Sequence, residues 1–306
     1  MHSNIIEKRL AVCYNLSMNY ARVKSYAKVN LTLDILGVKD GYHMLDSLVA
    51  SVDIYDVISV KKRKDRLVNV TMHGMGSESI PPENNNAVRC AELFIEQFDT
   101  TGADVTVWKN IPMGAGLGGS SADVAGVLNA LAKVYEVTDY DRLKAVADSV
   151  GSDCGYMLKG GFARISGRGE RVERIDSNLK LNLGLLLPKQ GVNTSACYKL
   201  YDGLATGNPA TTEGAVRALR LGDKAALGKS LANALTQPAV ALNGEISGCI
   251  SELEAFDPLG VSMTGSGSGV FALFENDQFL SYAQSRYRGK ARFIMTKTVI
   301  PSMEDK

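Results

Sequence analysis

A run of four glycines and two serines, set between an apolar stretch and a helical pattern, constrains this chain more than any other feature. The segment from Pro112 to Ser121 reads PMGAGLGGSS, and small or apolar side chains then recur at helical spacing as far as Val137. Glycine lets the backbone approach a ligand closely, and a helix N-terminus offers unpaired N–H groups with a favourable dipole. The run therefore predicts a cradle for phosphate. Its predicted binding residues are Pro112, Met113, Gly114, Ala115, Gly116, Leu117, Gly118, Gly119, Ser120 and Ser121.

Two familiar phosphate loops do not fit this run. No Gly-Lys-Ser or Gly-Lys-Thr closes it, which excludes a Walker A loop. A dinucleotide fingerprint would begin at Gly114, but no acidic residue closes a convincing strand about 20 residues further on. The structural alternative is a glycine-rich turn before a packed helix. We would favour that alternative for a bare GxGxxG, whereas the longer string favours phosphate binding.

Length and composition bound the remaining possibilities. The 306 residues suit one compact two-domain protein, since single cores stop growing near about 250–300 residues. A net charge of +1 gives no sign of a general nucleic-acid or membrane-surface binder, and we interpret the basic run at residues 61–64 as a solvated strand end. Five cysteines without a CxxC pair argue against a disulfide framework or a zinc site and fit a reducing cytoplasm. No apolar run approaches the ~20 residues of a membrane span.

The order of strand and helix patterns predicts an α+β fold. Residues 26–33 alternate polar and apolar side chains, which is typical of a strand with one solvated face. Strand and helix patterns then alternate irregularly, with no repeat, long linker or low-complexity tract. We expect an extension at residues 1–17, an N-terminal domain at 18–177 and a C-terminal domain at 178–306, with the border where the first glycine-rich region ends.

Several segments together resemble the GHMP kinases, the family of galactokinase, homoserine kinase and mevalonate kinase. PMGAGLGGSSADVAG resembles their phosphate loop, and MTGSGSGVFALF at 263–274 resembles their third motif. AKVNLTLDILG at 27–37, DGYHMLDSL at 40–48 and KNIPMGAGLGGSSAD at 109–123 look like 4-diphosphocytidyl-2-C-methyl-D-erythritol kinases. The resemblance covers roughly residues 19–299. It implies the two-domain GHMP kinase fold, with an ATP-binding N-terminal domain of the ribosomal-protein-S5-domain-2-like type and a C-terminal ferredoxin-like α/β sandwich.

The resemblance also implies two catalytic residues. Lys28 lies on the solvated face of the first predicted strand, where a cation could hold the attacking hydroxyl and neutralise the transferring phosphoryl group. Asp153 aligns with the aspartate of the family's Gly-Ala-Asp-Val-Pro segment, which accepts or orients the substrate proton. Without the resemblance, a lone strand lysine reads as solvated and a glycine-flanked aspartate as a turn former. Cys154 and Gly155 replace the family's valine and proline, so the loop loses proline's fixed φ and the substrate geometry stays open.

Substrate-binding residues are implied at further positions. Tyr42 and His43 match the family's pair for cytosine, because a ring can stack on a base and an imidazole can hydrogen-bond its edge. Tyr198 matches a second aromatic position, and the loop from Gly265 to Gly267 is expected to close over phosphate or substrate. Without a binding role, Tyr42 and His43 would be an exposed pair of residues in a turn, and residues 265–267 would form a tight hairpin-like turn. The expected substrate-binding residues are Asn30, Tyr42, His43, Tyr198, Gly265, Ser266 and Gly267.

The implied reaction transfers the γ-phosphate of ATP to the 2-hydroxyl of 4-diphosphocytidyl-2-C-methyl-D-erythritol, in the non-mevalonate route to isoprenoids. ATP and Mg²⁺ are the expected cofactors; Ser120, Ser121 or Asp123 could position the magnesium, and no metal ligand is assigned. We expect a cytoplasmic monomer or homodimer that acts on a small molecule, without a nucleic-acid or membrane partner. The alternatives are a GHMP kinase for homoserine, mevalonate or another small alcohol, and a catalytically silent nucleotide-binding relative. Lys28, Asp153 and both glycine loops argue against the silent relative.

Overall fold

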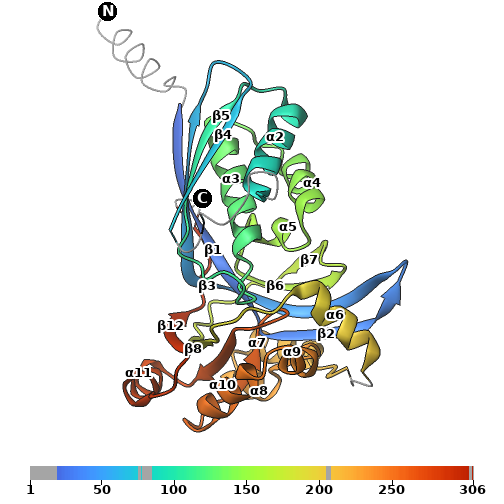
Figure 1. The fold of residues 1–306 in the computed structure, drawn as a ribbon, viewed down its shortest axis with the longest axis vertical. Coiled ribbons are helices and arrows are strands. Elements are labelled where there is room, and N and C mark those ends of the chain that lie inside the picture. The colour runs from blue at the N-terminus through green and yellow to red at the C-terminus, as the bar shows by residue number, and fades with distance from the viewer. Residues whose placement is uncertain (1–18, 75–76, 78–84, 205–207, 303–304, 306) are drawn as a thin grey trace, which may run out of the picture.

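Two sheets, mostly antiparallel, organise the computed structural model of this chain (Figure 1). Within the described part, the first sheet has eight strands and the second has four, and helices pack against each of them. The α+β fold class expected from the sequence is confirmed. The expected extension at residues 1–17 lies outside the described residues. The structure describes residues 19–74, 77, 85–204, 208–302 and 305.

The first sheet is built around one long strand, β3 (Tyr42–Lys62), which pairs antiparallel with β1, β2, β5 and β6. Its register with β1 shifts between Tyr26 and Ala27, and the residues of β1 after this shift are buried on both faces. The one solvated face expected for this strand is therefore wrong beyond the shift, because the glycine-rich segment covers it: the Lys28 N–H donates to the Leu117 carbonyl. The other strands are β1 (Tyr20–Asn30), β2 (Thr32–Lys39), β4 (Val68–His73), β5 (Ala103–Trp108), β6 (Phe162–Gly167), β7 (Arg171–Arg174) and β9 (Ala232–Asn233).

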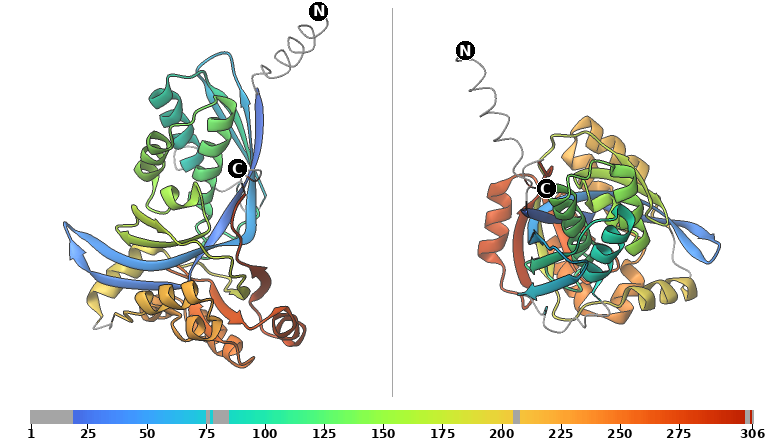
Figure 2. Two further views of the ribbon diagram at one scale, coloured as in Figure 1. Left: turned by 180° about the vertical axis from the view of Figure 1, so that it is seen from behind. Right: turned by 90° about the horizontal axis from the view of Figure 1, so that it is seen from above.

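Helix α3 (Gly119–Val134) packs directly on β1 and β3 and carries the core of this half. Small residues permit the close approach: a Cβ added at Gly126 would lie 2.5 Å from Cδ1 of Ile58. Helices α2 (Asn86–Phe98) and α4 (Tyr140–Val150) pack against α3 on the same side of the sheet (Figure 2). Each begins at a side-chain cap, since Asn85 accepts the N–H of Ala87 and Asp139 accepts that of Arg142. The short helix α5 (Cys154–Met157) follows α4.

The second sheet is antiparallel with the order β10–β11–β8–β12, and its central strand β8 is buried along its whole length. One of its faces carries a second core with α6, α9, α10 and α11, whereas α7 and α8 contribute to the first core. No helix in the described ranges is long and apolar enough to cross a membrane. The strands are β8 (Asn182–Leu187), β10 (Gly260–Met263), β11 (Val270–Phe274) and β12 (Arg292–Lys297). The helices are α6 (Thr194–Gly203), α7 (Thr212–Leu221), α8 (Lys224–Lys229), α9 (Thr236–Leu242), α10 (Glu245–Glu254) and α11 (Asp277–Arg286).

The two halves of the chain are joined by backbone pairing. Strand β9, from the C-terminal half, pairs parallel with β2 and so completes the first sheet. The hydroxyls of Thr32 and Thr212 lie 2.8 Å apart beside this junction. A bridge between Val52 and Thr298 makes a second junction. The border expected between residues 177 and 178 stays a prediction; the chain leaves the first sheet there, between β7 and β8, and returns to it once, at β9.

Candidate active site

The glycine-rich segment connects the end of β5 to the start of α3 and adopts a backbone that few other residues could follow. Gly114, Gly116 and Gly118 have φ of 68°, 70° and 71°, the left-handed region that favours glycine. Gly118 is also the N-cap of α3, and no side chain caps that helix. The first N–H groups of α3 therefore remain available to an anion, as expected for a phosphate cradle.

Two of these glycines also lie where a side chain would strike another part of the protein. A Cβ at Gly116 would lie 2.1 Å from the carbonyl oxygen of Thr264, in the C-terminal half. A Cβ at Gly118 would lie 2.9 Å from Cε of Met157 and 3.1 Å from Cγ of Lys28. The glycine-rich segment therefore packs closely against β1, α5 and the loop after β10.

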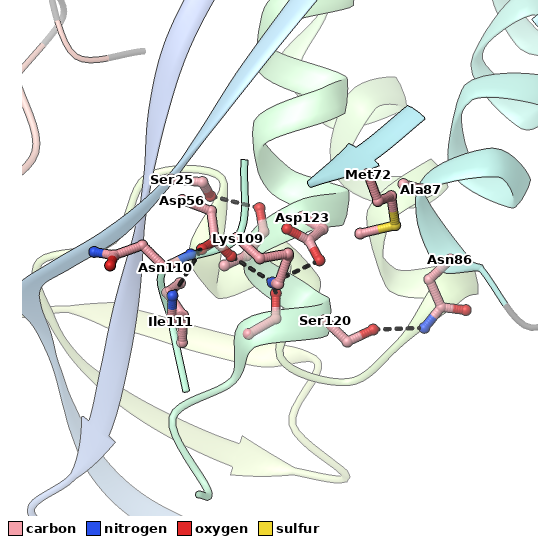
Figure 3. Close-up of polar contacts among 12 residues, drawn as sticks. Ser25, Asp56, Met72, Asn86, Ala87, Lys109, Asn110, Ile111, Ser120 and Asp123 are labelled. Atoms are coloured by element: carbon pink, nitrogen blue, oxygen red, sulfur yellow. Dashed lines mark hydrogen bonds and ion pairs between the residues drawn. The ribbon is translucent and has the colours of Figure 1, made fainter. Parts of the chain in front are cut away.

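A cleft of about 270 Å³, here called the nucleotide-side cleft, opens on one side of the segment. Residues from Pro112 to Ser120 line it, together with the N-terminal end of α2 and the side chains of Lys109 and Asp123. Asn86, from α2, donates to the Ser120 hydroxyl at 3.0 Å across the cleft (Figure 3). Of the predicted phosphate-binding residues, Ser121 alone does not line this cleft; it faces the opposite side.

A buried ionic cluster lies against the nucleotide-side cleft (Figure 3). The ammonium of Lys109 contacts the carboxylates of Asp56 and Asp123, the latter at 2.8 Å. The second oxygen of Asp56 accepts the N–H of Ile111 at 2.8 Å, so that carboxylate is fully used. Oδ1 of Asp123, in contrast, is buried without a hydrogen-bond partner. Asp123 thus presents one unpaired carboxylate oxygen in a wall of the nucleotide-side cleft.

The charges of this cluster shift the pKa of its members. Burial, followed by the neighbouring charge of Asp56, raises the pKa of Asp123 to about 7 although Lys109 opposes the change. Burial alone would lower the pKa of Lys109, but the two carboxylates outweigh it and raise that pKa. Two carboxylates share one ammonium, so the cluster favours retention of a proton on Asp123 near neutral pH.

A second and larger cleft, of about 630 Å³, lies on the other side of the segment and is here called the acceptor-side cleft. It shares Gly116 and Gly118 with the nucleotide-side cleft, so the two meet at the glycine-rich segment. The predicted residues that line it come from β1, β3, α6 and the loops after α4 and β10. They are Lys28, Asn30, Tyr42, His43, Asp153, Tyr198, Gly265 and Ser266.

Lys28 and Asp153 form an ion pair in the acceptor-side cleft. The distance from Nζ to Oδ2 is 3.3 Å, and the Lys28 side chain is 6% exposed while that of Asp153 is 35% exposed. Lys28 also donates to Oδ1 of Asn30, whose amide donates in turn to the Ser47 hydroxyl at 2.8 Å. The ammonium is thus fixed by two oxygens, and the carboxylate faces the space of the cleft.

The departure at Cys154 and Gly155 leaves the Asp153 carboxylate beside Lys28. Burial raises the pKa of the Cys154 thiol to about 12, so this cysteine stays protonated. A Cβ at Gly155 would lie 2.0 Å from Oδ1 of Asp148, and a proline at this position would collide with that carboxylate. A larger residue at position 155 would therefore require the Asp148 side chain to move.

The far end of the acceptor-side cleft is aromatic. The rings of His43 and Tyr198 lie 4.7 Å apart, and Nε2 of His43 lies 2.6 Å from a carboxylate oxygen of Asp202. Because a carboxylate accepts, Nε2 carries the hydrogen and Nδ1 remains for a ligand. Tyr42 is exposed, and the Arg168 guanidinium lies 4.4 Å from its ring centre. These side chains come from the β2–β3 hairpin, from α6, which lies beside it in Figures 1 and 2, and from the β6–β7 turn.

The loop after β10 holds the glycine-rich segment by its backbone. Ser268 and Gly269 donate their N–H groups to the carbonyls of Gly114 and Ala115, both at 3.2 Å. Gly265 and Ser266 line the acceptor-side cleft, whereas Gly267 packs toward Met263 and does not line it. The placement of Gly267 thus differs from that of its two predicted partners, because the loop turns it toward the second core.

Several polar residues of the two clefts were not found by sequence reasoning. Asp56 and Lys109 gave no signal, because nothing in the sequence brings the middle of β3 to the end of β5. Ser47, Asp202 and Arg168 read as ordinary strand, helix and turn residues.

The fold and these two clefts define a small-molecule kinase of the GHMP type. Residues 85–162 match the GHMP kinases N terminal domain and residues 215–288 match the GHMP kinases C terminal model. A crystal structure of homoserine kinase from Cytophaga hutchinsonii superposes with a TM-score of 0.75 at 18% identity, covering 94% of this chain and 97% of that one, which supports the fold alone.

The particular branch of the family follows from two nearer relatives. A 4-diphosphocytidyl-2-C-methyl-D-erythritol kinase of Clostridium beijerinckii is 31% identical over 284 residues, which is 91% of this chain and 100% of the relative. A crystal structure of 4-(cytidine 5'-diphospho)-2C-methyl-D-erythritol kinase superposes with a TM-score of 0.72 at 29% identity, covering 91% of this chain and 100% of that one. The chain belongs to the GHMP kinase family, in the branch of these kinases, and is an ATP-dependent phosphotransferase that acts on an alcohol group.

Proposed function

We propose that this protein transfers the γ-phosphate of ATP to the 2-hydroxyl of 4-diphosphocytidyl-2-C-methyl-D-erythritol. The observation that carries the proposal is the position of the Lys28–Asp153 ion pair, in a cleft that shares Gly116 and Gly118 with the nucleotide-side cleft. A phosphoryl group bound at the glycine-rich segment from one side would meet a hydroxyl bound from the other. Relatives at about a third identity are named for this substrate, which supports its choice, and the family resemblance implies the 2-hydroxyl.

In this mechanism, Asp153 accepts or orients the proton of the attacking hydroxyl, and the hydroxyl oxygen forms a bond to the γ-phosphorus as ADP leaves. Lys28 neutralises charge that spreads over the phosphoryl oxygens. Its burial strengthens this interaction because little water competes with it. Asn30 fixes the direction of the Lys28 ammonium, so the lysine needs no reorganisation when the charge develops.

Mg²⁺ is expected to accompany ATP. In the described part of the chain, no group of three or more His, Cys, Asp or Glu side chains could hold a metal with protein ligands alone. Mg²⁺ is usually bound through one or two carboxylates together with phosphates and water, which the unpaired Oδ1 of Asp123 and the Ser120 hydroxyl fit. Asp123 and Ser120 are therefore the residues that would hold it; Asp123 would release its proton when the ion binds, and the ion would neutralise charge on the phosphates.

The aromatic end of the acceptor-side cleft would hold the cytosine. Tyr42 and Tyr198 offer ring faces for stacking, and Nδ1 of His43, in the tautomer that donates from Nε2 to Asp202, is an acceptor that suits the exocyclic amino group of cytosine. Uracil carries a carbonyl at that position and would leave Nδ1 opposite another acceptor. The same argument predicts that the enzyme distinguishes the two bases.

The test is ATP consumption against the cytidyl substrate, its uridyl analogue, homoserine and mevalonate, each with and without a chelator of divalent cations. We expect turnover of the cytidyl substrate alone at a useful kcat/KM, and loss of that turnover when Mg²⁺ is removed. A preference for homoserine or mevalonate would contradict the proposed substrate while leaving the kinase class intact. Sizing of the same preparation separates the proposed monomer from the proposed homodimer.

A further inference from the structure

Arg168 lies at the acceptor-side cleft, and its guanidinium forms no ion pair among the described residues, although its charge helps to lower the pKa of the neighbouring Glu170. The other arginines of the β6–β7 hairpin, Arg164, Arg171 and Arg174, each have a carboxylate or carbonyl oxygen as partner. Within the residues that the structure describes, the Arg168 guanidinium has no such partner and instead lies over the ring of Tyr42. This cation–π contact takes up no oxygen acceptor, so the guanidinium keeps N–H donors that can bind an anion.

The turn that carries Arg168 is fixed without any ligand. Gly167 and Gly169 on either side have φ of 71° and 116°, which side chains rarely adopt. A carboxylate oxygen of Glu170 accepts the backbone N–H of Arg168 at 2.6 Å, and a Cβ at Gly169 would lie 2.9 Å from Cβ of Ser152. The Arg168 side chain therefore extends from a rigid turn toward the acceptor-side cleft. Because the turn is already fixed, little conformational entropy would be lost when a ligand binds.

The charges along the acceptor-side cleft explain why such a group is needed. Three carboxylates line it, and each already has a donor: Asp148 has Lys144, Asp153 has Lys28, and Glu170 has the backbone of its own turn. An acceptor with two ionised phosphates would bring about two further negative charges into this cleft. Lys28 is engaged at the reacting end, so a second cation is required for the diphosphate.

We propose that Arg168 binds the diphosphate of the acceptor substrate, an inference that rests on the proposed function. The guanidinium presents a planar fork of donors that matches two phosphate oxygens at once. Its position over the Tyr42 ring places this fork beside the ring proposed for the base, as a nucleoside diphosphate requires. The competing explanation is that Arg168 only supports the Tyr42 ring, in which case it would act on the base and not on the phosphates.

The experiment measures equilibrium binding of cytidine and of CDP to the full-length protein by calorimetry, with ADP present at saturation to occupy the nucleotide-side cleft. Arg168→Gln removes the charge, Arg168→Lys retains it without the planar fork, and Arg171→Gln removes a neighbouring exposed charge of the same hairpin. We expect Arg168→Gln to weaken CDP about tenfold and cytidine less than about twofold, since a charged hydrogen bond at an exposed site is of this order. Arg168→Lys should recover part of the loss, and Arg171→Gln should bind both ligands as wild type does.

Turnover of the cytidyl substrate gives a second readout. Arg168→Gln should raise KM about tenfold with kcat nearly unchanged, because the diphosphate contact exists equally before and during phosphoryl transfer. Equal losses of cytidine and CDP, or no loss of CDP, would overturn the inference while wild-type turnover of the cytidyl substrate upheld the proposed function. Wild-type protein that neither binds CDP nor uses the cytidyl substrate would overturn the proposed function and the inference with it.

Discussion

The two clefts that meet at the glycine-rich segment are built in opposite ways. The nucleotide-side cleft is formed largely by backbone, by left-handed glycines and by an ionic cluster buried beneath it. The acceptor-side cleft is formed by side chains from both halves of the chain, and Tyr42 and Arg168 at its far end are exposed. The residues that would bind ATP are thus part of the core. The residues that would select the acceptor substrate are exposed, so a substitution there should disturb the rest of the fold little.

The largest expected effect comes from Gly116, which belongs to both clefts. Gly116→Val should abolish turnover and nucleotide binding, because its Cβ would strike the Thr264 carbonyl and because valine tolerates a φ of 70° poorly. A side chain at this position would also take up space that the phosphates need. Calorimetry with ATP measures the loss, and circular dichroism establishes that the variant is folded.

Gly222→Val is the matched control for this change. Gly222 has a φ of 71°, but a Cβ there would meet nothing within 4 Å. This control should therefore lose about 1–2 kcal/mol of stability, the usual cost of a left-handed backbone, and keep its nucleotide affinity. Normal ATP binding by folded Gly116→Val would show that the glycine-rich segment is only structural. The assignment of the nucleotide-side cleft to ATP would then fail.

The next largest effect tests the reacting end of the acceptor-side cleft. Asp153→Asn should lower kcat by roughly 10²–10⁴, the usual contribution of a positioned acid–base group, with little change in ATP affinity. Asp141→Asn, an exposed change in the first turn of α4, serves as the control. Steady-state kinetics decide the matter, and near-wild-type turnover of Asp153→Asn would contradict the role proposed for this carboxylate.

A third prediction concerns the pH dependence of stability, which the buried ionic cluster beside the nucleotide-side cleft should cause. The pKa of Asp123 is raised from 3.8 to about 7, so the folded protein holds a proton that the unfolded chain has lost between about pH 4 and 7. Wild-type stability should fall as pH rises through this window and level off above it. Asp123→Asn cannot titrate, so its melting temperature relative to wild type should rise by several degrees between about pH 5 and about pH 8. An equal difference at both pH values would contradict the proton on Asp123.

The smallest effect is expected at the aromatic end. His43→Ala should raise KM for the cytidyl substrate by roughly 2- to 13-fold, corresponding to a lost hydrogen bond of about 0.5–1.5 kcal/mol. Discrimination against the uridyl analogue should fall in the same variant, since neither base would then face the imidazole. The measurement is kcat/KM for both substrates with both proteins. A wild-type enzyme that ignores the base would contradict the role proposed for this end of the cleft.

Local patterns were enough to predict the glycine-rich segment, the α+β class and most helices and strands, because each rests on neighbours in sequence. The family resemblance then indicated Lys28 and Asp153, which the structure places 3.3 Å apart. Contacts between distant segments escaped prediction. The burial of Lys28 depends on the segment that covers β1, and strand β9 depends on its pairing with β2. The Asp56–Lys109–Asp123 cluster and the contact of Arg168 with the Tyr42 ring join strands, helices and turns that no sequence period connects.

The backbone bonds from Ser268 and Gly269 to the glycine-rich segment have a consequence for how the protein is made. All residues of the phosphate cradle have been added once the chain reaches residue 121, yet two of the backbone donors that hold its shape are added nearly 150 residues later. A chain emerging from the ribosome therefore carries the whole cradle with only part of its backbone support until Ser268 and Gly269 have been added. ATP can act as a ligand that stabilises the fully supported cradle only after the loop that follows β10 has been made.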